Sequence, residues 1–254
     1  MKNRWMKAAA LAVCLAFSFP AAARADETAR TADFGQLENL HAALDRTAGL
    51  TSYDWTQEST ASYSGIGVTL TVTGQSQFQA AGVGTDGFTA LRREQNSALG
   101  VTEETVSFYT GGCYYGEEYG FPMKSAMDPD AAFDALAGLF FSKEGSGICD
   151  ALAPGFSAPS VTADGDSTVY TYVAGADFLA EISGEGPEQY SVLAVQFYVG
   201  PDGYVDREKM EVRAWETEGD QRYDMVLYLD GHLNSPGSQV SISLPSTEGY
   251  GEWN

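Results

Sequence analysis

The sequence predicts an α+β protein in which a curved antiparallel sheet, an incomplete β-barrel, wraps around two amphipathic helices. Three observations carry this prediction. Apolar residues recur at helical spacing in two long segments and alternate with polar residues in most of the remaining chain. The strand-like and helix-like segments do not alternate regularly, as they would in a parallel sheet. Strands with one apolar face need a cover, and the two helices are the elements that can supply it.

The two helices are marked by capping residues as well as by their periodicity. The first is expected over residues 34–48, with Asp33 in a variant capping box and Gly49 as its stop signal. The second is expected to begin after Asp128, which can cap it, and to end near Ser142. Both helices present an apolar stripe to the predicted sheet.

Strands are expected where the apolar period changes to two. The expected strands cover about residues 53–55, 66–73, 88–90, 106–108, 114–115, 168–173, 191–199, 204–215, 222–229 and 240–244. Gly200-Pro201-Asp202-Gly203 is a turn sequence, so the two long strands on either side of it should form a hairpin. The last of these strands is expected to close the sheet.

The first 25 residues have the pattern of a cleaved export signal. Basic residues precede an apolar run from Ala8 to Phe19, and small residues follow at the cleavage position. An uncleaved anchor is the alternative, but the run is short for a hydrocarbon core of about 30 Å. We expect one domain over residues 26–245, a flexible acidic tail over 246–254, and a secreted or periplasmic location.

The chain is strongly acidic. Four of its 14 basic residues lie in the predicted signal, so cleavage would leave 10 basic against 35 acidic residues, a formal charge of −25. Phosphate binding depends on clustered Lys and Arg, which excludes nucleic acid as a partner. Anionic membrane surfaces should repel the protein, and the same charge favours solubility.

Two cysteines, Cys113 and Cys149, would remain after signal cleavage. In an oxidising compartment an even pair of cysteines predicts a disulfide. The alternative is two buried thiols that act as small hydrophobic residues. Two thiols cannot build a Cys-rich metal site, and we expect neither a metal nor another cofactor.

Catalytic motifs are missing from the sequence. A Ser-His-Asp hydrolase needs a histidine base, and the chain has only His41, on the first helix, and His232, after a glycine. No nucleophile elbow, phosphate-binding loop or zinc-protease motif is present. Acidic pairs such as Glu103-Glu104 are abundant, so a carboxylate-based hydrolase stays open as a less favoured alternative. The prediction is a protein without enzymatic activity.

Several features follow one another in a telling order. They are a first helix followed by Tyr53 and Trp55, a hairpin at 109–115, a capped helix after Asp128, a turn at 201–203 and a final Leu244-Pro245. This order resembles the lipoprotein-carrier superfamily that includes the LolA-like and LppX/LprG-like half-barrels, over about residues 36–245. The resemblance implies an incomplete barrel that holds an acyl chain in an apolar cavity. The lipidation cysteine of the lipid-anchored members is missing.

We therefore expect a binding protein for a lipid or another hydrophobic small molecule. Its ligand should contact apolar residues of the second helix and of the facing strands. These candidate ligand-binding residues are Trp55, Val68, Leu70, Phe133, Leu136, Phe140, Met210, Val212, Met225 and Leu227. The alternative is an interaction or sensor module, in which the aromatic run from Tyr114 to Phe121 recognises a cell-surface protein or a glycan.

Overall fold

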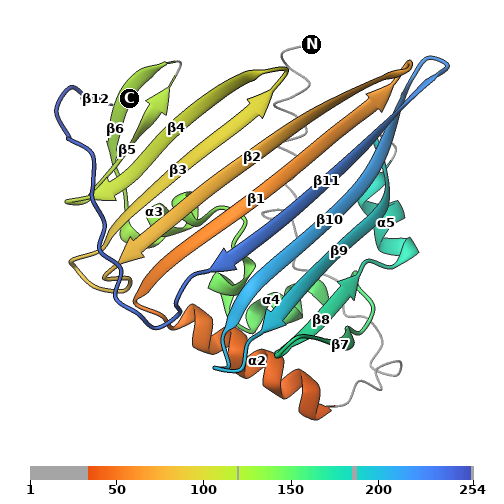
Figure 1. The fold of residues 1–254 in the computed structure, drawn as a ribbon, viewed down its shortest axis with the longest axis horizontal. Coiled ribbons are helices and arrows are strands. Elements are labelled where there is room, and N and C mark those ends of the chain that lie inside the picture. The colour runs from red at the N-terminus through yellow and green to blue at the C-terminus, as the bar shows by residue number, and fades with distance from the viewer. Residues whose placement is uncertain (1–33, 119, 185–187, 253–254) are drawn as a thin grey trace.

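The computed structural model describes residues 34–118, 120–184 and 188–252 and contains a twelve-stranded sheet. The strand order is β12-β6-β5-β4-β3-β2-β1-β11-β10-β9-β8-β7, and the sheet is open, with β12 and β7 at its edges (Figure 1). All neighbouring strands are antiparallel except β12 and β6. The predicted fold class, an α+β incomplete barrel, is confirmed. The predicted signal peptide and the Asp33 cap lie outside the described residues.

The strands are β1 (Ser52–Gly65), β2 (Val68–Ala81), β3 (Thr89–Ala98), β4 (Val101–Thr110), β5 (Cys113–Glu118), β6 (Phe121–Ala126), β7 (Ser160–Asp164), β8 (Ser167–Val173), β9 (Glu188–Val199), β10 (Val205–Glu218), β11 (Gln221–Leu233) and β12 (Gly251–Glu252). The helices are α2 (Phe34–Ala48), α3 (Pro129–Ala137), the 3-10 helix η1 (Phe141–Glu144), α4 (Gly147–Leu152) and α5 (Ala176–Ser183). The helices lie on one side of the curved sheet, and this side is called the inner face (Figure 1).

The sheet consists of two wings that meet where β1 pairs with β11. Strands β1 to β6 form one wing as a simple meander, and β7 to β11 form the other. The helices α3, η1 and α4 connect the two wings in sequence. Because that connection crosses the inner face, both wings share one helical cover.

Helix α2 is held at its C-terminal end by both wings. The Tyr53 hydroxyl on β1 donates to the carbonyl oxygens of Thr47 (2.9 Å) and Ala48 (2.8 Å), which have no partner within the helix. The Thr47 hydroxyl accepts a hydrogen bond from the amide of Val205 on β10 (2.9 Å). The first predicted helix is therefore present, and it ends where Gly49 predicted.

Helix α3 ends at Ala137, five residues before the predicted end at Ser142. Gly138 has a φ of +59°, and Arg92 Nη1 donates to the carbonyl oxygen of Leu136 (2.8 Å), one of the last in the helix. The apolar periodicity continues past the glycine, but there it belongs to a loop. This loop places Phe140 against the sheet, stacked on Trp55 with ring centroids 4.4 Å apart.

Two hydrophobic clusters lie between the helices and the sheet. The cluster under α2, α4 and α5 is mainly aliphatic, and its most buried members include Leu40, Leu44, Leu152, Leu193, Val195, Phe197, Val205 and Met210. The cluster under α3 is mainly aromatic and includes Tyr53, Trp55, Phe78, Phe88, Tyr109, Leu136 and Phe140. Each wing thus has its own core, and the helical connection joins them.

Two predicted strands differ in the structure. Ile66 (φ 53°) and Gly67 (φ 72°) form the turn between β1 and β2 instead of belonging to a strand. Residues 240–244 do not pair with the sheet, because β11 is already paired on both sides, with β1 and with β10. The chain instead returns to the opposite edge, where Tyr250 packs against Tyr115 and β12 pairs with β6. Tyr250 and β12 lie within residues 246–254, the segment predicted as a flexible tail.

The predicted disulfide is wrong, because Cys113 and Cys149 are both free thiols. Cys113 begins β5 and packs beside Leu91 and Phe108 in one wing. Cys149 lies in α4, in the aliphatic cluster of the other wing, where the Tyr172 hydroxyl donates to its sulfur (3.5 Å). The sequence spacing was compatible with a bond, but the fold assigns the two residues to different wings. Burial raises the pKa of the Cys149 thiol.

Candidate ligand-binding face

An apolar row crosses the inner face of the sheet and is called the inner apolar row. Its members are cross-strand partners on β4, β3, β2, β1, β11, β10 and β9: Val101, Ala98, Val72, Ala61, Leu227, Val212 and Leu193. They share a face with Trp55 and Phe78, since residues an even number apart on a strand point the same way. Seven strands at about 4.8 Å spacing make this row roughly 30 Å long.

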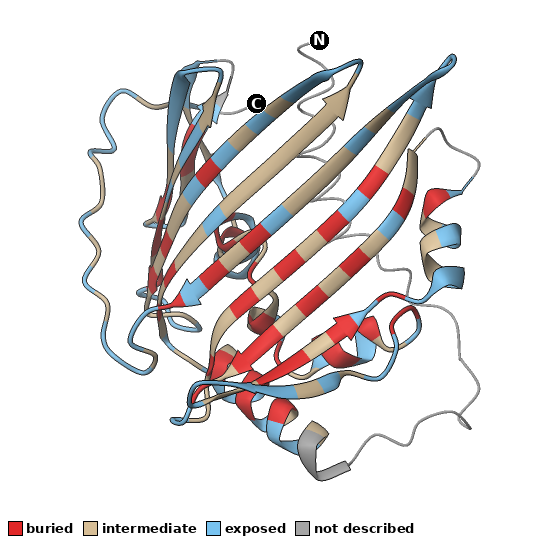
Figure 2. Ribbon diagram, turned by 45° about the vertical axis from the view of Figure 1, so that its right-hand side comes forward, coloured by how far each residue is buried: buried red, intermediate tan, exposed pale blue. Residues whose placement is uncertain are grey.

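The inner apolar row is closed at one end and open at the other. Leu193 and Val212 are buried in the aliphatic cluster, whereas Ala61, Val72 and Leu227 are half-buried. Val101 at the far end is 62% exposed. Figure 2 shows buried residues concentrated where the helices cover the strands and intermediate or exposed ones towards the hairpin ends of β1 to β4.

A second apolar row lies beside the first, one step nearer the hairpin ends. It consists of Leu70, Tyr63, Met225, Ala214 and Tyr190, again as cross-strand partners. Leu70, Tyr63 and Met225 are half-buried. The two rows together form an apolar wall that is only partly covered.

A polar band separates this wall from the aromatic cluster. Gln57, Ser76 and Glu94 are neighbours in register on β1, β2 and β3, between Trp55 and the inner apolar row. The ring of Trp55 leans over Gly231, which is in register with Gln57. Among the described residues, the indole N–H of Trp55 is a buried donor without a hydrogen-bond partner. Buried donors of this kind normally find a partner.

Glu208 continues the polar band onto β10 and fastens the helical cover. Its carboxylate is buried and accepts hydrogen bonds from the amides of Phe141 (2.9 Å) and Ser142 (2.7 Å) and from the Ser142 hydroxyl. Burial raises the pKa of Glu208 to about 7, although these hydrogen bonds oppose the shift. The carboxylate therefore anchors η1 to the sheet.

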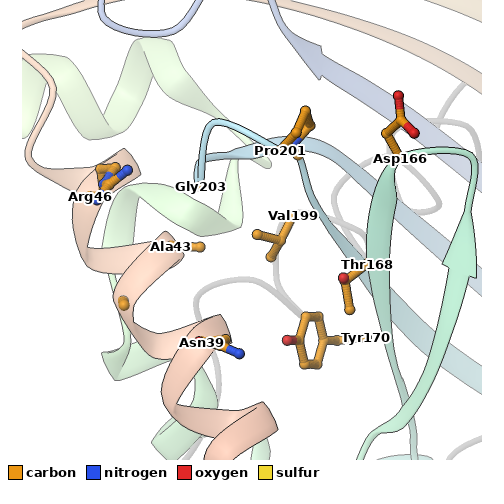
Figure 3. Close-up of a pocket in the computed structure, with 11 residues that line it drawn as sticks. Asn39, Ala43, Arg46, Asp166, Thr168, Tyr170, Val199, Pro201 and Gly203 are labelled. Carbon is orange, nitrogen blue, oxygen red and sulfur yellow. The ribbon is translucent and has the colours of Figure 1, made fainter.

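A pocket of about 340 Å³ opens between α2 and the end of the wing formed by β7 to β11 (Figure 3). It is lined by Asn39, Ala42, Ala43, Arg46, Asp166, Thr168, Tyr170, Val199, Gly200, Pro201 and Gly203. Arg46 Nη1 donates to the Asp202 carbonyl (2.8 Å), which fixes the turn that roofs the pocket. This pocket was not predicted from the sequence. The available signal was the small side chains of Ala42, which is exposed, and Ala43, which is buried, since both leave space beside the helix.

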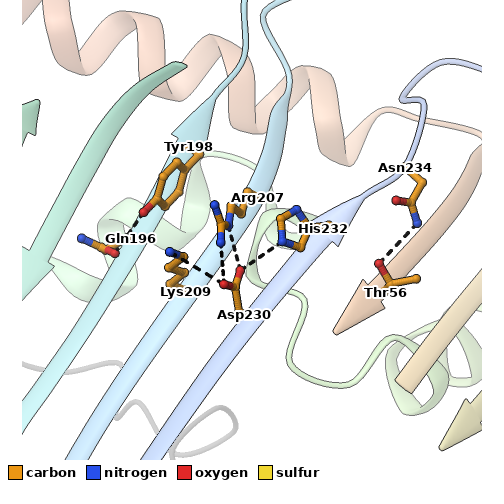
Figure 4. A network of polar contacts seen from close by, with 8 residues as sticks. All are labelled: Thr56, Gln196, Tyr198, Arg207, Lys209, Asp230, His232 and Asn234. Carbon is orange, nitrogen blue, oxygen red and sulfur yellow. Dashed lines mark hydrogen bonds and ion pairs between the residues drawn. The ribbon is translucent and has the colours of Figure 1, made fainter. Parts of the chain in front are cut away.

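The outer face of the sheet carries ion pairs instead of an apolar wall (Figure 4). Asp230 accepts two hydrogen bonds from Arg207 (2.8 and 2.6 Å), and Lys209 (3.7 Å) and His232 (3.2 Å) lie close to it. Burial opposes ionisation, but the contacts from Arg207 hold the pKa of Asp230 below its usual value. His232, considered as a catalytic base, thus belongs to a surface ion cluster.

The structure separates the candidate ligand-binding residues into four groups. Trp55, Phe133, Leu136 and Phe140 belong to the aromatic cluster, and Met210 belongs to the aliphatic one. Val212, Leu227, Met225 and Leu70 come together in the two apolar rows. Val68 is 68% exposed beside the turn between β1 and β2. Ala61, Tyr63, Ala98 and Val101 were not predicted from the sequence, because their position on this face depends on the strand register.

The aromatic run from Tyr114 to Phe121, which the alternative prediction of an interaction module used, does not form one exposed surface. Tyr115 is buried and stacked on Phe108 (4.6 Å), and Tyr114 packs against the aromatic cluster. Phe121 is 68% exposed. Tyr119 lies outside the described residues.

The fold and site define an open half-barrel with a helix-covered core and a partly accessible apolar wall. The chain matches no protein-family model and no curated protein. It is similar to LprF from Mycobacterium bovis, with 13% identity, 84% of this chain and 97% of LprF covered, and a TM-score of 0.46. The half-barrel arrangement that the predicted resemblance implies is present in the structure.

Two further solved structures are similar at lower scores. A phycobiliprotein lyase from Guillardia theta is 6% identical over 75% of this chain and 90% of its own, with a TM-score of 0.22. A DUF1329 family protein from Desulfovibrio piger is 9% identical over 79% and 93%, with a TM-score of 0.25. All three scores are below 0.5, so the fold assignment rests on the strand order and the helix positions.

No group of three or more His, Cys, Asp or Glu side chains in the described ranges is placed to hold a metal ion. No helix in the same part of the chain is long and apolar enough to cross a membrane.

Proposed function

We propose that this protein is a non-enzymatic, extracytoplasmic binding protein that holds a lipid or another apolar ligand against the inner apolar row. The observation that carries the proposal is the half-buried apolar wall formed by two adjacent rows of cross-strand partners. Burial of this surface contributes about 25 cal/mol per Å², which is enough to drive binding without a cofactor.

The closed clusters are less suited to hold a ligand than the wall. Leu136 and Phe140 are 0% exposed and Trp55 is 1% exposed, so their surface is already removed from water. Leu227, Met225 and Leu70 still have surface to lose. The proposed ligand-contacting residues are therefore the half-buried members of the two rows.

The shape of the wall favours an elongated ligand with a polar end. The inner apolar row runs across the strands from a closed end near Leu193 to an open end at Val101. The polar band flanks the row on β1 to β3, and the unpaired indole N–H of Trp55 lies beside it. An acyl chain along the row, with a neutral polar group over the band, would use both surfaces.

The location is part of the proposal and rests on the sequence of the first 25 residues. Cleavage after Ala25 should leave Asp26 as the first residue. Mass spectrometry of the N-terminal peptide, recovered from outside the cytoplasm, tests this. A chain found inside the cytoplasm with residues 1–25 intact would contradict it.

Ligand binding is tested with a fluorescent acyl probe and by native mass spectrometry after gentle purification. Leu227→Gln places an amide in the inner apolar row and should weaken probe binding by about tenfold or more. Val226→Gln is the matched control, because this neighbour on β11 faces the other side of the sheet. Wild-type protein that carries no ligand and has no affinity for the probe would refute the proposal, as would equal losses in both variants.

A further inference from the structure

Three neighbouring hairpins end in exposed apolar side chains, here called the apolar tips. The β1–β2 tip carries Ile66 (66% exposed) and Val68 (68%), and the β3–β4 tip carries Leu99 (84%) and Val101 (62%). The β5–β6 tip carries Phe121 (68%). These tips lie together along the upper edge of the sheet in Figure 1, away from α2.

Two of these side chains occupy backbone positions that disfavour them. Ile66 and Leu99 have φ values of 53° and 52°, and each precedes a glycine that also has positive φ, Gly67 (72°) and Gly100 (79°). Both central residues of such two-residue hairpin turns need positive φ, which favours Asn-Gly and is strained for a β-branched or bulky residue. An apolar side chain here lowers stability and, given its exposure, packs little against the described fold.

We infer that the apolar tips insert into the interface of a lipid bilayer whose headgroups carry no net charge. The tips are separate projections roughly 15 Å apart, since two strand spacings and an offset of four residues along the strands separate neighbouring tips. A protein partner would need a matching pocket for each projection, whereas a fluid interface accepts isolated apolar side chains.

The charge around the apolar tips selects the kind of bilayer. Glu103 and Glu104 follow the β3–β4 tip, Glu117 precedes the β5–β6 tip, and all three are exposed. The chain as a whole is acidic, with a formal charge of −21. An anionic surface would repel these groups, so zwitterionic headgroups are the matching partner.

The apolar tips are continuous with the proposed binding face. Val101 is both a tip residue and the open end of the inner apolar row, and Val68 is two residues from Leu70 in the second row. An apolar ligand could therefore pass from the bilayer along the sheet without crossing a polar surface. Docking itself rests on the tips alone, and only this transfer rests on the proposed function.

The test replaces both strained residues in one chain, Ile66→Asn with Leu99→Asn. The protein is purified as the producing cell makes it, and its binding to phosphatidylcholine vesicles is measured by flotation. We expect about a tenfold or greater loss of vesicle binding, because two apolar side chains no longer enter the interface. The thermal midpoint should rise, because Asn-Gly fits both turns. A loss of vesicle binding together with a higher thermal midpoint excludes misfolding as the cause of the loss.

A control variant, a second vesicle composition and a soluble probe show whether the loss of vesicle binding is specific to the apolar tips. Val173→Asn, which changes an exposed apolar residue on β8 (45% exposed), should leave vesicle binding unchanged. Vesicles that contain phosphatidylserine should bind the wild type less well. The double variant should bind a soluble acyl probe like the wild type, which separates docking from ligand binding.

Three outcomes would overturn the inference. Wild-type protein that does not bind phosphatidylcholine vesicles would do so, as would a double variant that binds them equally well. A wild type that self-associates through the tips, shown by a change of oligomeric state in the double variant, would assign the tips to contacts between copies of the chain.

Discussion

The two halves of the same strands differ in how deeply their inward-facing side chains are buried, although both halves alternate apolar and polar residues in the same way. Strand β1 begins with Tyr53 and Trp55, both 1% exposed, and continues with Ala61 and Tyr63, which are half-buried. All four point to the inner face. The helical cover lies over only the first half. Alternation therefore determines which face a residue occupies, and the cover determines whether that face becomes a core or an accessible wall.

The largest expected effect comes from emptying the covered half. Phe140→Ala should lower the free energy of unfolding by about 3–5 kcal/mol, because the ring is buried and stacked on Trp55. Leu70→Ala, in the open half, should cost about 1 kcal/mol or less. Chemical denaturation measures both. Equal losses would show that the open half is packed as tightly as the covered one.

The next effect concerns the carboxylate that fastens the cover. The pKa of Glu208 is raised from 4.5 to about 7 in the folded protein, so folding favours its protonated form. This contribution is fully present below pH 4.5 and is lost as the pH rises through 7. Stability from this group should fall by about 3 kcal/mol between pH 4.5 and pH 8, as denaturation at a series of pH values would measure.

Glu208→Gln is the control for this pH dependence. The amide keeps an acceptor oxygen for the backbone of η1 but cannot ionise. The variant should lose this component of the pH profile, and it also loses one hydrogen bond, because its NH2 group cannot accept from the second backbone amide. An unchanged profile in the variant would assign the dependence to other groups.

A smaller effect distinguishes two inward-facing glycines. A methyl group on Gly231 would collide with the ring of Trp55, in the covered half, whereas on Gly74 it would meet only the side-chain ends of Ser59 and Asn96. Gly231→Ala should cost about 1–3 kcal/mol and Gly74→Ala much less, since flexible side chains can move aside. Thermal unfolding of the two variants compares them, and the opposite ranking would contradict the difference between the halves.

The smallest effect is expected from a reductant. Because Cys113 and Cys149 are free, dithiothreitol should leave the thermal midpoint unchanged. Mass spectrometry after alkylation of the unfolded protein should find two modified thiols at these positions without prior reduction. A thermal midpoint lowered by dithiothreitol would instead support the predicted disulfide between Cys113 and Cys149.

The fold class followed from the sequence because most of the long strands carry a clear alternation and both predicted helices have capping sequences, although β6, β7 and β12 were not predicted. The end of α3 did not, because Leu139 and Phe140 continue the helical spacing beyond Gly138. Residues 240–244 alternate like a strand, but the place beside β11 is taken by β1. Strand pairing depends on the whole sheet, so a local sequence pattern does not predict which strands still have an unpaired edge.

The candidate site was predicted only in part for the same reason. Leu70, Val212, Met225 and Leu227 were assigned to the correct face by alternation alone. Their separation from Trp55 and Phe140 required the register and the position of the cover. Ala61 is too small to stand out in the sequence, although it lies between Val72 and Leu227 in the structure.

The return of the chain after β11 has a consequence for how copies of this protein meet. The segment from Asn234 travels from the middle of the sheet to its border, where Gly251 and Glu252 occupy the free side of β6. A border strand with unpaired amides is a template for joining sheets from different molecules. Gly251 and Glu252 pair with Met123 and Lys124, so they cover the middle of this border strand.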